Sequence, residues 1–292
     1  MKVTGFSFIK DALIYDYPIV EAIKSILPIC DEFVVAVGKS NDDTLNLIKE
    51  IDKNKIKIIE TQWDENLRKG GRVLAIETDK AFAEVSKDSD WAFYIQGDEV
   101  VHEKYLNTIY NSMLQFKDNE KIDGLLFKYL HFYGSYDYVG ASSNWYKHEI
   151  RVIKNNKSIY SFKDAQGFKK GNNKQLNVIP IDAYIYHYGW IREPKAMQRK
   201  QENFHKLWHD DNWVNEFVVK ADEFDYGMHV KELKPFLEEH PEVMKKRIAA
   251  KNWKFTYDVS INRKTLKDKF KEFMANHFGL EFGYKNYIIK KI

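Results

Sequence analysis

The sequence predicts an α/β protein, with a mostly parallel sheet flanked by helices and a helical extension at the carboxyl end. Two observations support this fold class. Short apolar segments alternate with segments of helical periodicity over about the first 115 residues, and this alternation is typical of βαβ units. From Pro194 onward the apolar spacing is helical. We therefore expect a first domain over residues 1–193 and a helical extension over residues 194–292 that packs on it.

The expected elements follow from these two patterns. Strands are expected where β-branched and aromatic residues form short apolar runs, and helices where apolar residues recur every three or four positions. In the first domain the expected strands are residues 3–9, 32–38, 55–60, 91–95, 125–129, 149–153 and 183–186, and the expected helices are residues 17–27, 44–51 and 73–86. In the extension the expected helices are residues 195–208, 230–240, 242–252 and 264–278.

The composition is that of a soluble globular protein. Of the 292 residues, 44% are hydrophobic and 30% are charged. No apolar run approaches the roughly 18 residues of a membrane span, and Lys10 and Asp11 come before any long apolar stretch, which argues against a secretory signal. Cys30 is the single cysteine, so no disulfide framework is expected. We expect a cytoplasmic protein.

The net charge of +3 is too small to predict a nucleic-acid partner. It is unevenly distributed, because residues 226–292 contain 15 Lys and Arg against 8 Asp and Glu, a net of +7 that leaves −4 for the rest. This basic segment is either a solvated helical surface or a peripheral contact with the inner face of an anionic membrane. The aromatic residues of the extension are too apolar to remain in water, so we expect it to form a lid or a homo-oligomer surface.

An acidic pair follows the strand expected at residues 91–95. The chain continues through Gln96 and Gly97 to Asp98 and Glu99, and the carboxyl ends of strands are where α/β sheets bind ligands. Mg²⁺ and Mn²⁺ prefer carboxylate oxygens and substrate phosphates. The pair therefore predicts a divalent metal bound together with a diphosphate, or else a solvated turn whose charges favour the start of the next helix.

Two further turns are expected at the same edge of the sheet. Ser40 and Asp42 follow the second strand and either cap the next helix or hold a nucleotide, although neither a dinucleotide fingerprint nor a P-loop is present. Arg68, Gly71 and Arg72 lie just before a helix, where cations and free backbone amides suit phosphate. A basic surface turn is the alternative for this second segment.

Three residues in the middle of the chain are further candidates. His187 ends an expected strand and can complete a metal site only if it faces Asp98. Glu149 alternates with Arg151 on one strand, which fits a structural ion pair. A carboxylate at Glu149, or at Asp164 in the following loop, could also act as a general base.

These segments, in this order, resemble glycosyltransferase family 2, which has the GT-A fold. The resemblance covers roughly residues 1–190. It rests on the opening strand Val3-Thr4-Gly5-Phe6-Ser7-Phe8-Ile9-Lys10, the turn Ser40-Asn41-Asp42-Asp43-Thr44, the Gly71-Arg72 helix start, and Gln96-Gly97-Asp98-Glu99, which is similar to the family's Asp-x-Asp metal motif. Residues 17–23, 164–168 and 187–190 are similar to a bacterial subgroup of that family.

The resemblance implies a metal-dependent enzyme of polysaccharide biosynthesis. It would move a sugar from a UDP- or GDP-sugar to a carbohydrate or lipid-linked acceptor hydroxyl, with inversion. It implies Mn²⁺ or Mg²⁺ bound by Asp98 and His187, and Asp164 as the catalytic base with Glu149 as its rival. The implied donor-binding residues are Ser7, Ile9, Ser40, Asp42, Arg68, Gly71, Arg72, Gln96 and Gly97.

Two departures from the family pattern keep alternatives open. Gln96 replaces the first acid of the metal motif and is a poor metal ligand. Val37 and Gly38 stand where the family has a base-contacting aspartate. One alternative is a sugar-phosphate nucleotidyltransferase, although residues 3–10 lack the Gly-rich loop expected of that class. The other is a catalytically silent nucleotide- or carbohydrate-binding protein of the same fold.

Overall fold

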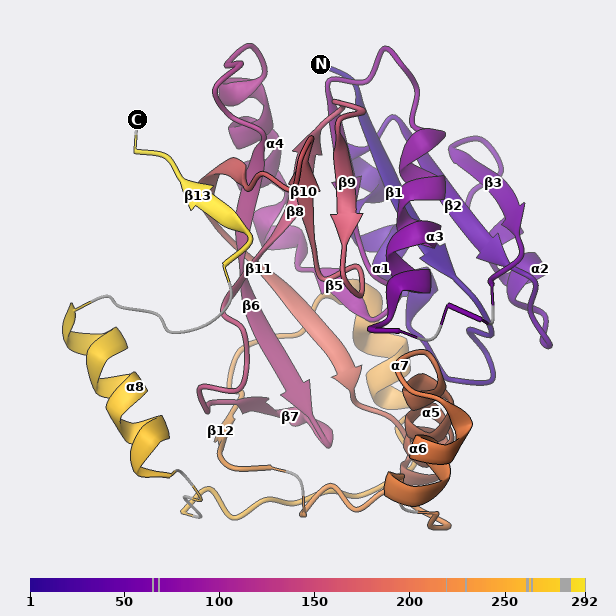
Figure 1. Ribbon diagram of the computed structural model, residues 1–292, viewed down its shortest axis with the longest axis vertical. Coiled ribbons are helices and arrows are strands. Elements are labelled where there is room, and N and C mark those ends of the chain that lie inside the picture. The colour runs from indigo at the N-terminus through magenta and orange to yellow at the C-terminus, as the bar shows by residue number, and fades with distance from the viewer. Residues whose placement is uncertain are drawn as a thin grey trace.

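The protein has one large sheet with helices on both of its faces (Figure 1). The computed structural model describes residues 1–64, 66–67, 69–218, 220–228, 230–260, 263, 265–278 and 285–291. Within these residues, eleven strands join the large sheet and two more form a separate hairpin. The α/β fold class expected from the sequence is confirmed.

The elements alternate between strand and helix before a strand-rich middle. The strands are β1 (Val3–Ile9), β2 (Glu32–Gly38), β3 (Ile56–Thr61), β4 (Trp91–Tyr94), β5 (Glu99–Val101), β6 (Gly124–Tyr133), β7 (Ser135–Gly140), β8 (His148–Lys154), β9 (Ile159–Phe162), β10 (Gly167–Lys170), β11 (Leu176–Trp190), β12 (Leu233–Pro235) and β13 (Tyr287–Ile289). The α-helices are α1 (Ile19–Ile26), α2 (Thr44–Lys49), α3 (Arg72–Ala83), α4 (Leu106–Phe116), α5 (Pro194–Lys206), α6 (Asp211–Phe217), α7 (Lys245–Ala249) and α8 (Leu266–Phe278). Short 3₁₀ turns are η1 (Leu27–Ile29), η2 (Glu103–Tyr105) and η3 (Glu242–Met244).

The amino-terminal part of the sheet is parallel. β1 lies between β2 and β4, and β3 lies beyond β2, all in one direction. β8 is antiparallel to β4, and β6 is antiparallel to β8 and parallel to β11. The resulting order, β3-β2-β1-β4-β8-β6, is consistent with a GT-A-like fold. Because β1 to β4 run the same way, their carboxyl ends meet along one edge, where α/β sheets bind ligands.

Both faces of this parallel part are buried. On β2, Phe33 and Val35 pack in the hydrophobic cluster that includes α1 and α4, whereas Val34 and Ala36 pack in the cluster that includes α3. Successive side chains of a strand point to opposite faces, so a strand covered on both faces must be apolar throughout. This requirement explains why residues 32–38 were recognisable as a strand.

The segment from Pro194 onward packs on the sheet and contributes strands to it. β12 pairs antiparallel with β7, and β13 pairs parallel with β11. Phe236 packs against Phe132, and Trp253 Nε1 donates a hydrogen bond to the Gly134 carbonyl at 2.8 Å. None of the helices within the described part of the chain is long and apolar enough to cross a membrane. The division into two domains at residue 193 stays a prediction.

The prediction of a helix at residues 230–240 is wrong, because Leu233–Pro235 form strand β12. The apolar spacing of Val230, Leu233 and Phe236 suggests a helix. However, Pro235 lies inside the segment, where it lacks the N–H of a helical hydrogen bond and clashes with the preceding turn. An edge strand tolerates proline, and β12 ends the sheet order. The helix expected at residues 242–252 is shorter in the structure, where the 3₁₀ turn η3 is followed by α7 and the helix ends at Ala249.

Candidate active site

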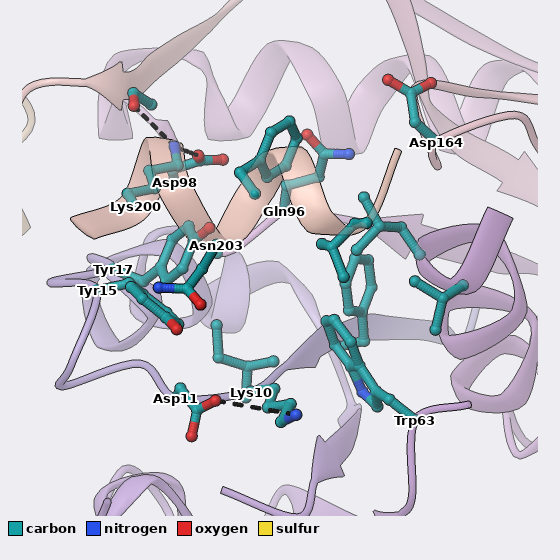
Figure 2. Close-up of a pocket in the computed structure, with 18 of the residues that line it drawn as sticks. Lys10, Asp11, Tyr15, Tyr17, Trp63, Gln96, Asp98, Asp164, Lys200 and Asn203 are labelled. Atoms are coloured by element: carbon teal, nitrogen blue, oxygen red, sulfur yellow. Dashed lines mark hydrogen bonds and ion pairs between the residues drawn. The ribbon is translucent and has the colours of Figure 1, made fainter. Parts of the chain in front are cut away.

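A cavity of about 760 Å³ opens at the carboxyl edge of the parallel strands (Figure 2). Its walls come from the segments after β1, β3 and β4, the end of β11, the loop between β9 and β10, the start of α3, and α5. Six residues that the sequence placed at the site line this one cavity: Ile9, Gln96, Gly97, Asp98, Asp164 and His187. The structure therefore brings these six residues together at one cavity, and their roles in a site stay a prediction.

The two adjacent carboxylates after β4 have different environments. Asp98 lines the cavity. Glu99 is fully buried and accepts hydrogen bonds from Arg151 Nε at 2.7 Å, Arg151 Nη2 at 2.6 Å and the Tyr129 hydroxyl at 2.8 Å. The ion pair expected between Glu149 and Arg151 is thus corrected, because Arg151 pairs with Glu99. A buried, fully hydrogen-bonded pair of this kind holds its backbone in place, so Glu99 fixes the segment that presents Asp98.

Lys200 of α5 reaches the cavity beside Asp98 (Figure 2). Its Nζ lies 3.6 Å from Asp98 Oδ2 and donates a hydrogen bond to the Gly189 carbonyl at 2.9 Å. Burial and the nearby Arg192 guanidinium lower the pKa of Lys200 to about 7, against the opposing effect of Asp98. Burial by itself would raise the pKa of Asp98, but His187 and Lys200 hold it below its usual range. Asp98 is therefore ionised at neutral pH.

Arg192 adds a second buried cation near Lys200. Its Nη1 donates to the same Gly189 carbonyl at 2.5 Å, and its Nε donates to the Tyr15 carbonyl at 2.6 Å. The guanidinium lies 4.7 Å from the centre of the Tyr17 ring. Its Nη2 is buried without a hydrogen-bond partner, and no carboxylate in the described part of the chain forms an ion pair with it. Buried charges are normally paired, so this end of the cavity has an excess of positive charge.

His187 lies opposite Glu99 in the pairing of β11 with β5, which brings its ring beside Asp98. The ring Nε2 is 3.7 Å from Asp98 Oδ1, and the Nδ1 is 3.1 Å from Nδ1 of His131. Burial lowers the pKa of His187, against the opposing effect of Asp98. A Cβ at position 189 would lie 2.5 Å from His187 Cε1 and 3.0 Å from Asp98 Oδ2. Gly189 therefore permits the contact between these two side chains.

Asp164 lies at another end of the cavity, apart from Lys200 and Asp98 (Figure 2). It occupies the tight loop of the β9–β10 hairpin, where both neighbours have positive φ, 58° at Lys163 and 64° at Ala165. Burial raises the pKa of the Asp164 carboxyl. A carboxylate that binds protons more readily than usual is suited to general base catalysis.

Gln96 connects the two ends of the cavity. Its Nε2 donates hydrogen bonds to the Ala165 carbonyl at 3.0 Å and to the Tyr94 hydroxyl at 3.3 Å. Its backbone N–H donates to Glu99 Oε2 at 3.1 Å. Gln96 therefore joins the end of β4 to the loop that contains Asp164, and its amide nitrogen is engaged in that contact.

Glu149 lies outside the lining of the cavity. Its Oε1 accepts a hydrogen bond from Gln166 Nε2 at 2.7 Å, and its Oε2 accepts one from Asn286 Nδ2 at 3.2 Å. Gln166 itself lines the cavity. Burial raises the pKa of Glu149 to about 7. The Gln166 side chain thus lies between Glu149 and the cavity. The role of Glu149 as a base stays a prediction.

Three of the expected donor-binding residues form structural contacts outside the lining. Ser7 donates a hydrogen bond to the Ile95 carbonyl at 2.6 Å. Ser40 accepts one from the Asp11 backbone N–H at 3.0 Å, and Asp42 accepts two from the backbone of the same segment, at 2.9 and 2.8 Å. These bonds hold the turn after β2 against the segment after β1. Donor binding by these side chains stays a prediction.

The turn before α3 contacts the end of α5. Gly71 has a φ of 67°, and its N–H donates to the Leu207 carbonyl at 3.3 Å, so this amide is already engaged. Arg72 is exposed and does not line the cavity. Arg68 lies outside the described residues. Phosphate binding by this turn therefore stays a prediction.

Several lining residues were missed by the sequence analysis, among them Lys10, Asp11 and Trp63. Lys10 Nζ lies 5.7 Å from the centre of the Trp63 ring and 4.0 Å from an Asp11 carboxylate oxygen (Figure 2). They follow β1 and β3, so the strand-end argument applied to Asp98 could have found them.

The side chains as they lie do not fit a resident divalent metal. Asp98 and His187 are ligand types that Mn²⁺ accepts. However, one Asp98 oxygen faces the His187 ring and the other faces the Lys200 ammonium, which repels a second cation. Within the described part of the chain, no three His, Cys, Asp or Glu residues are grouped to hold a metal ion. Metal dependence stays a prediction, and we derive no chemistry through a metal.

No family model matches this chain, and no curated protein matches it. Solved structures resemble it at low identity. Residues 1–349 of TarS from S. aureus are 13% identical with a TM-score of 0.40, over 76% of this chain and 67% of that chain. The longer TarS chain is 16% identical with a TM-score of 0.40, over 70% of this chain and 39% of that chain.

Two other solved structures resemble shorter parts of the chain. Glucosyl-3-phosphoglycerate synthase from Mycobacterium tuberculosis, in complex with Mn²⁺, UDP and glucosyl-3-phosphoglycerate, is 17% identical with a TM-score of 0.31, over 45% of this chain and 44% of that chain. The 4-diphosphocytidyl-2C-methyl-D-erythritol synthase from Anaerococcus prevotii is 11% identical with a TM-score of 0.33, over 53% of this chain and 71% of that chain.

Proposed function

We propose that the protein is a glycosyltransferase that moves a sugar from a UDP- or GDP-sugar to the hydroxyl of a carbohydrate or lipid-linked acceptor. The distribution of charge in one cavity of about 760 Å³ supports this best. A diphosphate suits the end with Lys200, because a cation binds phosphate through charge-assisted hydrogen bonds, and the buried charge of Arg192 lies next to Lys200. An acceptor hydroxyl that must lose a proton suits the end with Asp164. The volume is in the range of small-molecule sites.

The transfer is a single displacement. The acceptor oxygen attacks the anomeric carbon of the sugar while the bond from that carbon to the diphosphate oxygen breaks. The electron pair of the broken bond leaves with the nucleoside diphosphate, and the nearby cations stabilise the negative charge that develops there. The hydroxyl proton passes to the Asp164 carboxylate. Attack from the side opposite the leaving group inverts the anomeric configuration.

We place the base of the nucleotide in the region of the cavity that is lined by Lys10, Asp11 and Trp63. Trp63 offers a flat aromatic surface for it, and Asp11 offers a carboxylate that can accept hydrogen bonds from a base. The donor would then extend from Trp63 past Gly97 to Lys200, with its sugar turned toward Asp164.

A donor panel tests this proposal. The protein is incubated with UDP- and GDP-sugars, with and without Mn²⁺, and release of nucleoside diphosphate is followed. Slow hydrolysis of one donor, reduced in the Asp164→Asn variant, is the expected result. Binding without any turnover would instead favour a catalytically silent binding protein. Formation of a nucleotide sugar from a sugar phosphate and a nucleoside triphosphate would favour a nucleotidyltransferase.

A lipid-linked acceptor would place the protein at a membrane. Residues 226–292 have a net charge of +7, which would favour an anionic lipid surface. Co-flotation with anionic liposomes at physiological salt is the expected result in that case. Absence of flotation would favour a soluble carbohydrate acceptor. A homo-oligomer stays a prediction and is tested by light scattering.

A further inference from the structure

The end of the cavity where the sequence predicts a metal contains a lysine. The Lys200 ammonium lies 3.6 Å from Asp98 Oδ2 and 2.9 Å from the Gly189 carbonyl oxygen. A carboxylate and a carbonyl oxygen are also the ligands that a hard divalent cation prefers. The ammonium therefore occupies the electrostatic environment that a metal ion would require.

A second cation, Arg192, lies next to Lys200 but outside the lining of the cavity, and it forms no ion pair within the described part of the chain. Arg192 is fully buried, shares the Gly189 carbonyl with Lys200, and leaves Nη2 without a hydrogen-bond partner. Two basic side chains, Lys200 and Arg192, thus share the Gly189 carbonyl next to the single carboxylate of Asp98. A buried, unpaired guanidinium is costly unless an anion compensates for it. The group that would balance this charge is an anion with several acceptor oxygens.

We propose that Lys200 binds the diphosphate of the donor and takes the place of the predicted divalent metal, and that the charge of the buried Arg192 beside it adds to the attraction. The inference rests on the proposed function and specifies how its donor is held. In the transfer reaction the two cations stabilise the leaving diphosphate, as a metal does in metal-dependent enzymes. Asp98 then positions the Lys200 ammonium rather than coordinating a metal.

The test is calorimetric titration of the full chain with UDP, GDP and inorganic diphosphate, first with EDTA and then with Mn²⁺ or Mg²⁺. The variants are Lys200→Met, which removes the charge at similar length, and Lys200→Arg, which keeps the charge. Lys195→Met is the matched control, because Lys195 is on the same helix, is exposed and lies outside the cavity.

Binding of UDP or GDP by the wild-type protein in EDTA is the expected result. Loss of one charge-assisted contact to phosphate should weaken binding about 10- to 100-fold in Lys200→Met, with Lys200→Arg retaining more affinity and Lys195→Met unchanged. Inorganic diphosphate should compete with the nucleotide in the wild-type protein, and less so in Lys200→Met.

Two results would overturn the inference and leave the proposed function standing. One is nucleotide binding that requires Mn²⁺ or Mg²⁺, and the other is equal affinity of Lys200→Met and wild type in EDTA. Failure of both nucleotides to bind under any condition would overturn the proposed function as well. The metal comparison uses the wild-type protein alone, so the inference stays testable even if Lys200→Met does not fold.

Discussion

The Lys200 end and the Asp164 end of the cavity are built differently. The Lys200 end combines three segments that are distant in sequence, namely the turn after β4, the end of β11 and the helix α5. The Asp164 end comes mainly from one hairpin loop, supported by the buried Glu149 through Gln166. The first has excess positive charge and the second has carboxylates with raised pKa values. In the proposed function, this contrast is the reason for placing the donor diphosphate at one end and the acceptor proton at the other.

Replacement of Asp164 by Asn is expected to have the largest effect. Loss of a general base lowers turnover by about 10²- to 10⁴-fold, while donor affinity should change little because the proposed diphosphate site is at the other end. Steady-state kinetics and calorimetry on the same variant separate these effects. If Asp164→Asn lost donor affinity instead, the assignment of the donor diphosphate and the acceptor hydroxyl to separate ends of the cavity would be wrong. If Glu149→Gln, rather than Asp164→Asn, lost turnover, the base would be Glu149.

Glu149→Gln should make stability less sensitive to pH. Burial raises the pKa of Glu149 from its ordinary 4.5 to about 7. Between these values the folded protein keeps a proton that the unfolded chain releases, so stability falls as pH rises, by at most about 1.4 kcal/mol per pH unit. Asp79, whose pKa burial raises to about 6, adds to the same slope in both proteins. Urea unfolding at pH 5 and pH 8 measures the difference, and equal slopes would contradict the prediction.

Gly189→Ala tests the packing of the Lys200 end. The added Cβ would lie 2.5 Å from His187 Cε1, so the His187 and Asp98 side chains must move away from position 189. Overpacking of this kind costs about 1–3 kcal/mol. Gly97→Ala is the matched control, because its nearest contact is the flexible end of Ile9, at 3.0 Å. Urea unfolding should show a larger loss for Gly189→Ala, and a variant as stable as wild type would refute the close contact.

Asp98→Asn has the smallest expected effect at low pH, and it tests the role of Asp98. Asp98 raises the pKa of Lys200, so in Asp98→Asn the loss of UDP or GDP affinity in EDTA should begin at lower pH, while the affinity at pH 6 changes by no more than about 2- to 10-fold. A site in which Asp98 holds a metal would instead lose its Mn²⁺-dependent binding at every pH. Calorimetry from pH 6 to pH 8, with EDTA and then with Mn²⁺, distinguishes the two cases, and an unshifted pH profile in EDTA would argue against the Lys200 assignment.

Local sequence patterns predicted the parallel part of the sheet well. The expected bounds of residues 3–9 and 32–38 agree with β1 and β2, because strands buried on both faces require uninterrupted apolar runs. β11 was expected over residues 183–186 but runs from Leu176 to Trp190. Pro180 and Asp182 interrupt its apolar pattern, and only the pairing with β6 and β13 reveals its length.

The candidate site was predictable where its residues follow strands. Asp98 follows β4 of the parallel part, so topology alone places it at this edge. His187 lies on β11 opposite Glu99, and Asp164 lies in the loop of the separate β9–β10 hairpin, so their positions also depend on how these segments pack. Lys200 is one of several cations on α5, which also contains Lys195, Arg199 and Lys206, and spacing along the helix does not tell which one meets a cavity. That choice depends on how α5 docks on the sheet, which is a tertiary property.

The hydrogen bond from Arg192 Nε to the Tyr15 carbonyl joins positions 177 residues apart. Closing a chain loop of that length costs roughly 4–5 kcal/mol of entropy before any contact repays it, and such long-range contacts form slowly. The local βαβ units close much shorter loops. During refolding from urea, the chain should therefore regain its helical circular dichroism before it regains affinity for a nucleoside diphosphate.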